Sequence, residues 1–258
     1  MIYTTITVTE EAGVGLIRLN RPTLMNALNA QMRAEITQAV RDLGTRARVL
    51  VMTGEGRAFC SGQDLGAGAS INEIDLGRIL REEYEPMLRA IHECPVPVIA
   101  AVNGVAAGAG ANLALAADVV IATQSAVFLQ AFARIGLIPD AGGTYWLPRL
   151  VGFARAMGQS LFAGPVTADE AAATGLIWAS VPDDQFAAEW QARAAQLAQG
   201  PTLAYGAIKR ALRASMTADL DSQLDTEARL QGEMGATRDF REGVMAFLEK
   251  RPAKFEGR

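Results

Sequence analysis

Short apolar runs and helical patterns alternate along the first half of the chain, and this alternation limits the possible fold more than any other feature. Four runs read as strands, and amphipathic or small-residue helical segments separate them: Val14–Leu19, Val49–Met52, Val98–Val102 and Val119–Ala122. A strand–helix–strand order is typical of α/β folds. From Ala168 onward almost every segment has helical character. The sequence therefore predicts an α/β core followed by a helical region.

The N-terminal segment is expected to form a β-hairpin, because Ile2–Val8 alternates and Val14–Leu19 follows a turn. A helix is expected at about Ala27–Leu43 and another at about Leu80–Cys94, each with apolar residues at helical spacing. Pro86 falls inside the second pattern, so that helix should kink or begin there. Gly66–Ser70, between these two helices, reads as a flexible stretch.

A change of pattern near residue 195 divides the chain into two predicted parts. Residues 1–195 form the α/β core, and residues 196–258 form a C-terminal helical oligomerisation region. Apolar faces in this region, such as the one formed by Leu203, Ile208 and Leu212, need a partner surface. The sequence therefore predicts a homo-oligomer.

Charge and cysteine content exclude several classes of protein. The net charge is −4 and the basic residues are scattered, which argues against a nucleic-acid partner. Cys60 and Cys94 give no disulfide framework and fit a reducing cytosol. The uncharged stretch Cys94–Ala117 is long enough to span a bilayer, but prolines and asparagines interrupt it, so no membrane helix is expected. We expect a soluble, cytoplasmic protein.

Three glycine-rich segments carry the candidate chemistry. Phe59–Leu65 and Gly104–Asn112 offer bare backbone to a ligand, and the turn Gly136–Thr144 contains Asp140. Backbone N–H donors combined with one carboxylic acid can stabilise an enolate and move a proton. The alternative, that Asp140 only caps a turn and that the glycines only permit close packing, stays open from the residues alone.

Other kinds of site are disfavoured. The segment around Gly108 and Gly110 lacks the third glycine of a dinucleotide fingerprint, and no phosphate-binding Gly-Lys-Ser/Thr motif occurs. His92 is the sole histidine, which argues against a Ser-His-Asp hydrolase and against a histidine-rich metal site, so no metal is predicted. Cys60 has no obvious general base nearby in sequence, and a core role is expected for it.

Five motifs in order identify the chain as similar to the crotonase (enoyl-CoA hydratase/isomerase) superfamily over nearly its full length. These are Leu19–Pro22 with Asn26–Leu28, Ala58–Asp64, Ala101–Gly104 with Gly108, Gly136–Thr144, and Glu242–Gly243 with Ala246–Arg251. The resemblance implies a ββα spiral core with a C-terminal helical trimerisation region. It also implies acyl-CoA substrates, no cofactor beyond the coenzyme A of the substrate, and a homotrimer or a dimer of trimers.

The resemblance also implies roles for individual residues. The backbone N–H groups of Ser61 and Ala109 are expected to form an oxyanion hole, where small side chains let the thioester oxygen approach closely. The positions that correspond to the coenzyme A pocket are Leu24, Asn26, Gln63, Asp64, Leu65, Phe247 and Lys250.

The departures from the family pattern indicate the reaction. Hydratases of the family carry two water-activating glutamates, and Asn112 and Phe132 stand at those positions here as expected substrate-pocket residues. Asp140 is then the expected acid and base. This combination resembles a branch that converts the ring epoxide 1,2-epoxyphenylacetyl-CoA to an oxepin-CoA in phenylacetate degradation. Alternatives are a Δ3,Δ2-enoyl-CoA isomerase, an aryl-CoA dehalogenase that also needs a histidine base, and a catalytically silent CoA-binding homologue.

Overall fold

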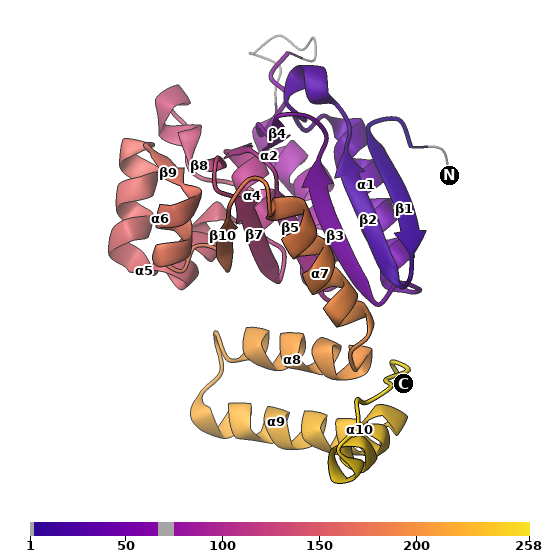
Figure 1. The fold of residues 1–258 in the computed structure, drawn as a ribbon. Coiled ribbons are helices and arrows are strands. Elements are labelled where there is room, and N and C mark those ends of the chain that lie inside the picture. Colours follow the sequence, from indigo (N-terminus) through magenta and orange to yellow (C-terminus); the bar gives the residue numbers. More distant parts are fainter. Residues whose placement is uncertain (1–2, 67–74) are drawn as a thin grey trace.

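The computed structural model describes residues 3–66 and 75–258, and within them two β-sheets organise the core (Figure 1). The larger sheet has six strands in the order β1-β2-β3-β5-β7-β10, and the smaller has four in the order β4-β6-β8-β9. The strands of the larger sheet are β1 (Ile6–Glu11), β2 (Val14–Leu19), β3 (Val49–Gly54), β5 (Val98–Val102), β7 (Val119–Thr123) and β10 (Ala179–Val181). Those of the smaller are β4 (Ala58–Cys60), β6 (Val105–Ala107), β8 (Val127–Leu129) and β9 (Pro165–Thr167).

The chain winds as a spiral, because successive pairs of strands are shared between the two sheets. In the pairs β3/β4, β5/β6 and β7/β8 the first strand joins the larger sheet and the second joins the smaller one. β2, β3, β5, β7 and β10 run parallel to one another, and β1 pairs antiparallel with β2. The mixed α/β spiral predicted from the sequence is confirmed. In the smaller sheet β4, β6 and β8 are parallel, so the segments that follow them leave the sheet at the same edge.

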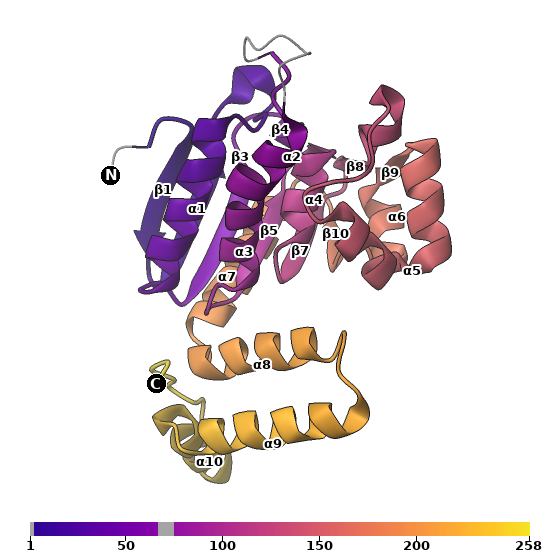
Figure 2. The ribbon, with the colours of Figure 1, turned by 180° about the vertical axis from the view of Figure 1, so that it is seen from behind.

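Helices cover both faces of the larger sheet. α7 (Phe186–Ala198) lies on one face, and the view from behind shows α1 (Ala30–Gly44) and α3 (Glu85–His92) on the other (Figure 2). Alternate residues of a strand point to opposite faces, so Val49 and Val51 pack with α7, whereas Leu50 and Met52 join the main core. This two-sided burial explains why the parallel strands are continuous apolar runs.

The predicted hairpin and long helices are present, with differences at their ends. β1 begins at Ile6, and α1 begins at Ala30 because Asn29 caps it by accepting from the Met32 N–H at 2.8 Å. The second predicted helix is three elements: α2 (Leu76–Ile79), a π-helical turn η3 (Leu80–Tyr84) and α3, whose first turn holds Pro86. The expected flexible stretch at residues 66–70 lies, apart from Gly66, outside the described residues.

Several elements were not predicted. The smaller sheet consists of three-residue strands, too short to show a hydrophobic period. α5 (Gly143–Phe162) was missed because it contains Pro148 and is broken at Gly152, whose φ is +76°. The small-residue helix expected between the strands at 98–102 and 119–122 is α4 (Ala109–Leu115). The remaining core elements are η1 (Pro22–Leu24), η4 (Ala131–Ile135) and α6 (Ala168–Ala173).

The C-terminal helices form a separate layer beside the core (Figure 1). They are α8 (Thr202–Ala214), α9 (Leu220–Gly235) and α10 (Arg238–Glu249). A buried ion pair joins α8 to the core: Lys209 Nζ lies 2.6 Å from Asp118 Oδ2 and donates to the carbonyls of Cys94 and Val96. Arg213 also donates to Asp118 at 2.6 Å. Among the described helices none is long and apolar enough to cross a membrane.

Candidate active site

The first two glycine-rich segments pack directly on each other. A Cβ added to Gly110 would lie 2.2 Å from the carbonyl oxygen of Cys60, and one added to Gly62 would lie 2.8 Å from that of Ala107. No side chain fits into either contact, which is why both positions are glycine. The turn after β4 therefore lies against the N-terminus of α4, as the sequence predicted for a shared backbone site.

Ala109 supplies one candidate donor at this junction. It is the first residue of α4, and the first N–H groups of a helix have no partner within the helix. A Cβ added to Gly62 would lie 3.5 Å from the Ala109 nitrogen, so the Ala109 N–H lies beside the turn after β4. The helix dipole adds partial positive charge at this point. The Ala109 N–H is therefore suited to donate to a negatively charged oxygen.

The Ser61 N–H does not fit its expected role, because it already donates to the carbonyl of Met25 at 3.0 Å. Gln63 is the better candidate. Leu28 bonds the residues on both sides of Gln63, accepting from the Asp64 N–H at 3.1 Å and donating to the Gly62 carbonyl at 2.8 Å. In an extended chain adjacent N–H groups point to opposite sides, so the Gln63 N–H faces away from Leu28. Among the hydrogen bonds of the described chain it donates none.

Asp140 lies in a strained turn that begins α5. Ala141 and Gly142, which follow it, both have positive φ, +48° and +83°. Its Oδ1 atom is buried and accepts no hydrogen bond within the described part of the chain. Burial without a compensating cation raises the pKa of Asp140 to about 6. A carboxyl group with this pKa can both accept and return a proton near neutral pH.

The side chains of Asn112 and Gln130 support this turn through two successive hydrogen bonds. Asn112 Nδ2 donates to the main-chain carbonyl of Asp140 at 2.7 Å, and Gln130 Nε2 donates to Asn112 Oδ1 at 2.8 Å. Asn112 is completely buried, and a Cβ on Gly143 would lie 2.5 Å from its Nδ2 atom. The expectation that Asn112 lines the substrate pocket is therefore wrong for its side chain. Its side chain holds the Asp140 turn in place.

Phe132, an expected substrate-pocket residue, lies beside the Ala109 segment. It is in η4 and 7% exposed, and a Cβ on Gly108 would lie 3.7 Å from its ring. The ring is therefore beside the residue that precedes the Ala109 donor. An apolar ring in this place cannot activate water.

The expected coenzyme A positions of the first half of the chain differ in accessibility. Leu24 and Leu65 are exposed, at 51% and 68%. Asp64 pairs with Arg21 at 2.8 Å, which together with the hydrogen bonds lowers the pKa of Asp64 despite its partial burial. Asn26 was expected to face the ligand, but its side chain is buried, donating to the carbonyls of Glu55 and Ala58 and accepting from the Arg21 N–H. It fixes the 21–27 turn.

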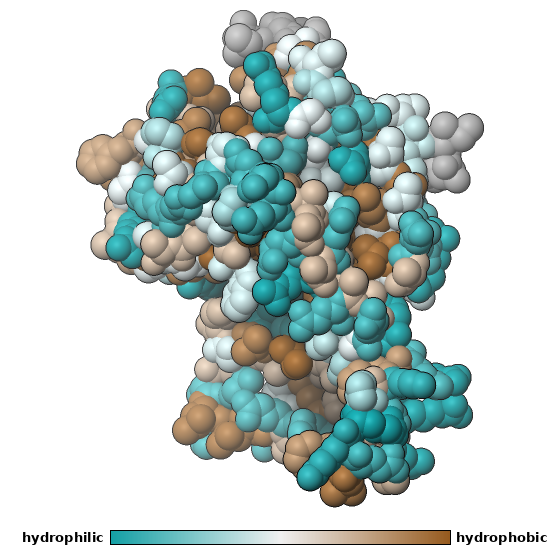
Figure 3. Space-filling model, viewed as in Figure 1, coloured by the Kyte–Doolittle hydropathy of each residue, from teal (hydrophilic) through white to brown (hydrophobic). Residues whose placement is uncertain are grey.

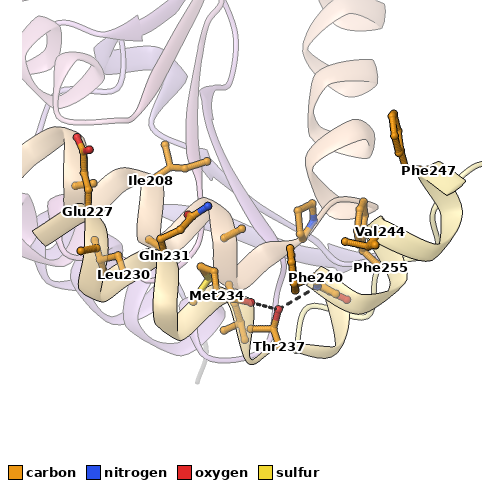
Figure 4. A pocket seen from close by; sticks show the side chains of 18 of the residues that line it. Ile208, Glu227, Leu230, Gln231, Met234, Thr237, Phe240, Val244, Phe247 and Phe255 are labelled. Carbon is orange, nitrogen blue, oxygen red and sulfur yellow. Dashed lines mark hydrogen bonds between the residues drawn. The ribbon is translucent and has the colours of Figure 1, made fainter. Parts of the chain in front are cut away.

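Phe247 and Lys250 are not brought to the other site residues within one chain. Both lie at the end of α10, in the helical layer, whereas β4 and α4 are at the opposite side of the core (Figure 1). Phe247 is 82% exposed and borders an apolar groove of about 930 Å³ (Figure 4). The space-filling view shows hydrophobic side chains around the hollow between α8 and α9 (Figure 3). The groove is formed by Leu203, Ile208, Leu224, Leu230, Met234 and Val244, among others.

Three residues near the site were not singled out from the sequence. Gln130 supports Asn112, and Tyr84 and Arg33 both donate to the side chain of Gln63. Tyr84 was predicted only as part of a buried helical face. No local pattern identifies these partners, because each contact joins residues 18 to 30 positions apart.

Comparison with known proteins defines the family to which the chain belongs. Residues 9–258 match the enoyl-CoA hydratase/isomerase family, and the chain belongs to it. It is an enzyme of that family.

Relatives with different reactions match over the whole chain. A protein described as a probable enoyl-CoA hydratase, from Rhodobacter capsulatus, is 62% identical, with both chains fully covered. The 1,2-epoxyphenylacetyl-CoA isomerase of Escherichia coli is 45% identical over 96% of this chain and 97% of its own. The enoyl-CoA hydratase structure from Bacillus anthracis superimposes with a TM-score of 0.91 at 30% identity, covering 99% of this chain and all of that one.

Proposed function

We propose that this enzyme is a CoA-thioester isomerase that uses one carboxyl group, Asp140, as both acid and base. The observation that carries the proposal is the state of that carboxyl group. It is partly buried, one oxygen has no hydrogen-bond partner among the described residues, and its pKa is raised to about 6. Structural aspartates that cap turns accept hydrogen bonds from backbone N–H groups and have lowered pKa values. Burial of the Asp140 carboxyl group outweighs the one backbone N–H, its own, that lowers its pKa, and the net pKa is raised.

The reaction follows from the arrangement of donors and acid. The thioester oxygen would accept from the N–H groups of Gln63 and Ala109, which bind more strongly as negative charge develops on it. Asp140 removes the proton next to the thioester carbonyl, giving the enolate, and returns it to a carbon further along the acyl group. Atoms and charge balance without water. Coenzyme A enters and leaves as part of the substrate.

Hydration is disfavoured by the same residues. A hydratase must hold and activate a water molecule, which needs a second acidic or basic side chain near the first. Asn112 is committed to Asp140 and Gln130, and Phe132 is apolar. Neither can accept a proton from water.

We propose 1,2-epoxyphenylacetyl-CoA as the substrate and an oxepin-CoA as the product. In this conversion the carbon–carbon bond shared by the epoxide and the six-membered ring breaks, its electrons enter the new double bonds, and the oxygen stays bonded to both carbons. The proton that Asp140 removes next to the thioester carbonyl returns to a ring carbon, so the product has the mass of the substrate. The support is the identity of 45% with the E. coli isomerase of that substrate, together with the Asn112, Phe132 and Asp140 combination. A Δ3,Δ2-enoyl-CoA isomerase would use the same proton transfer on a different acyl group. An aryl-CoA dehalogenase fits less well. It needs a histidine base, and the sole histidine, His92 on α3, has its ring 5.4 Å from the Trp146 ring on α5 and no side-chain hydrogen bond to Asp140 among the described residues.

We also propose that the active form is a homotrimer or a dimer of trimers in the cytoplasm. The exposed apolar residues around the helical groove need a covering surface. Phe247 and Lys250 lie at the end of α10, in the helical layer, whereas β4 lies at the far end of the core (Figure 1). In an oligomer they would contact the coenzyme A of a neighbouring protomer.

A panel of acyl-CoA thioesters tests the reaction and the acyl group together. The panel contains the ring epoxide of phenylacetyl-CoA, a 3-enoyl-CoA, crotonyl-CoA and a chlorinated benzoyl-CoA. Conversion of the epoxide to an isomer of unchanged mass is the expected result. Preferred conversion of the 3-enoyl-CoA would reassign the substrate, and a product heavier by one water would show a hydratase. No turnover with any member would support a silent homologue.

A further inference from the structure

Two buried side chains anchor the side chain of Gln63. The Tyr84 hydroxyl donates to Gln63 Oε1 at 2.6 Å, and an Arg33 guanidinium nitrogen donates to the same oxygen at 2.9 Å. Arg33 and Tyr84 are each 3% exposed, and the guanidinium carbon lies 4.6 Å from the centre of the Tyr84 ring. Burial raises the pKa of Tyr84 well above its usual value, so the hydroxyl stays protonated and donates throughout the working pH range.

Arg33 is itself fixed by the backbone that flanks Gln63. It donates to the carbonyl of Leu28 at 2.7 Å, and Leu28 is the residue that bonds both neighbours of Gln63. Its other nitrogens donate to the carboxylate of Glu83. A buried arginine is stable only when its donors are satisfied, and here one nitrogen bonds Leu28 and Gln63 while the other two bond Glu83.

A π-helical turn ends at Tyr84, the residue that donates to Gln63. η3 (Leu80–Tyr84) inserts one residue into the helix between α2 and α3. One residue corresponds to about 100° of helix rotation, so the insertion changes the direction of the side chains that precede α3. π-turns within helices occur frequently at functional sites. Glu83 and Tyr84, its last two residues, both bind Arg33 or Gln63.

We propose that Tyr84 and Arg33 are positioning residues that hold the Gln63 peptide so that its N–H points at the thioester oxygen. The inference rests on the proposed function, in which that N–H is an oxyanion donor. The peptide needs such support because Gly62, which precedes it, has a φ of +98° and no side chain to restrict it. Donors must keep their aim within about 0.5 Å and 10–20° to stabilise a transition state.

The test measures polarisation of the bound thioester as well as turnover. The ligand is phenylacetyl-CoA labelled with ¹³C at the thioester carbonyl, which cannot isomerise, and the readout is the infrared stretching frequency of that carbonyl. Oxyanion donors lower this frequency. The variants are Tyr84→Phe, which removes only the hydroxyl donor, Gln63→Met, which removes the acceptor but keeps the main-chain N–H, and the double variant. Tyr205→Phe, in α8, is the matched control.

We expect Tyr84→Phe to lose most of the frequency shift and about 10-fold in kcat, with KM within about 2-fold, since one donor is misaligned rather than removed. Gln63→Met should lose about as much of the frequency shift and of kcat as Tyr84→Phe does. The double variant should lose no more of either quantity than each single variant. Tyr205→Phe should match the wild type. A Tyr84→Phe enzyme with a lowered melting temperature but a wild-type frequency and kcat would overturn the positioning role.

Failure of the proposed function gives a different result. If the wild type lowers the carbonyl frequency but isomerises no thioester, the assigned reaction is wrong, and the Tyr84→Phe comparison still decides the positioning role. If the wild type does not lower the frequency, the two-donor site is absent and both proposals fall.

Discussion

Asn112 donates its side-chain amide to the main-chain carbonyl of Asp140 at 2.7 Å, so the residue in a hydratase-acid position supports the acid that this chain does carry. Gln130 in turn fixes the orientation of the Asn112 amide. Glutamate in place of Asn112 would present an acceptor to the Asp140 carbonyl and lose this contact. The residue type at position 112 therefore affects Asp140: an asparagine at 112 stabilises the turn that carries Asp140, and a glutamate would not.

Asn112→Ala should damage both stability and turnover. The substitution leaves a buried Gln130 amide and the Asp140 carbonyl short of a partner, which costs about 1–3 kcal/mol in the free energy of unfolding. Turnover per folded molecule should fall as well, because the Asp140 turn loses its brace. Denaturant unfolding and kcat measured on one preparation check this. Unchanged kcat at reduced stability would show that the turn holds its shape alone.

Asp140→Asn should nearly abolish isomerisation. Asparagine has almost the same shape but cannot accept and return a proton, so the rate should fall by roughly 10²–10⁴-fold, or about 3–5 kcal/mol in the barrier. The thioester donors belong to other segments, so binding of a saturated acyl-CoA should change little. Steady-state kinetics measures the isomerisation rate, and calorimetry measures the binding of the saturated acyl-CoA. An Asp140→Asn variant with wild-type kcat would contradict the mechanism.

The raised pKa of Asp140 predicts two pH dependences. Activity, as kcat/KM, should rise as the pH passes about 6 and the carboxylate forms. The native state binds this proton more tightly than the unfolded chain, so the stabilising contribution is complete below about pH 4 and is lost as the pH rises through about 6. Asp140→Asn should therefore be more stable than the wild type at pH 8, and the difference should shrink as the pH falls toward 4. Melting temperatures across this range check the sign.

Crotonyl-CoA hydration should be very weak. Asn112 and Phe132 provide neither of two groups that each typically contribute about 10²–10⁴-fold to such a reaction. The 62% identical relative described as a hydratase makes this assay decisive. Loss of the crotonyl-CoA absorbance at the rate of an ordinary hydratase would refute the prediction.

The protein should be at least a trimer in solution. The groove side chains Leu203, Ile208 and Phe247 are 45%, 52% and 82% exposed in the single chain. Ile208→Asp should weaken assembly, because it places a charge in the apolar groove, whereas Lys254→Asp, on the exposed tail, should not. Light scattering at micromolar concentration gives the mass directly. A stable wild-type monomer contradicts the prediction.

Much of the fold could be predicted because the larger sheet is buried on both faces, which makes strands such as Val98–Val102 continuous apolar runs. The smaller sheet could not, since strands like Ala58–Cys60 are shorter than the pattern that would reveal them. Asp140 could be predicted as a site residue because it is the one acid in the glycine-rich turn Gly136–Thr144. The supporting roles of Asn26 and Asn112 could not be predicted, because their hydrogen-bond partners are backbone atoms about 30 residues away. The predicted boundary at residue 195 falls inside α7.

The ion pair between Lys209 and Asp118 has a consequence for how the molecule melts. Asp118 also accepts from the Val98 N–H at the first residue of a central strand, at 2.7 Å. Pulling α8 away would leave this carboxylate without its buried cation, which costs several kcal/mol and loosens the strand it holds. Separation of the helical layer from an intact core therefore carries this cost, which favours their melting together. Heating should give a single cooperative transition, with the calorimetric and van't Hoff enthalpies equal when referred to one assembled unit.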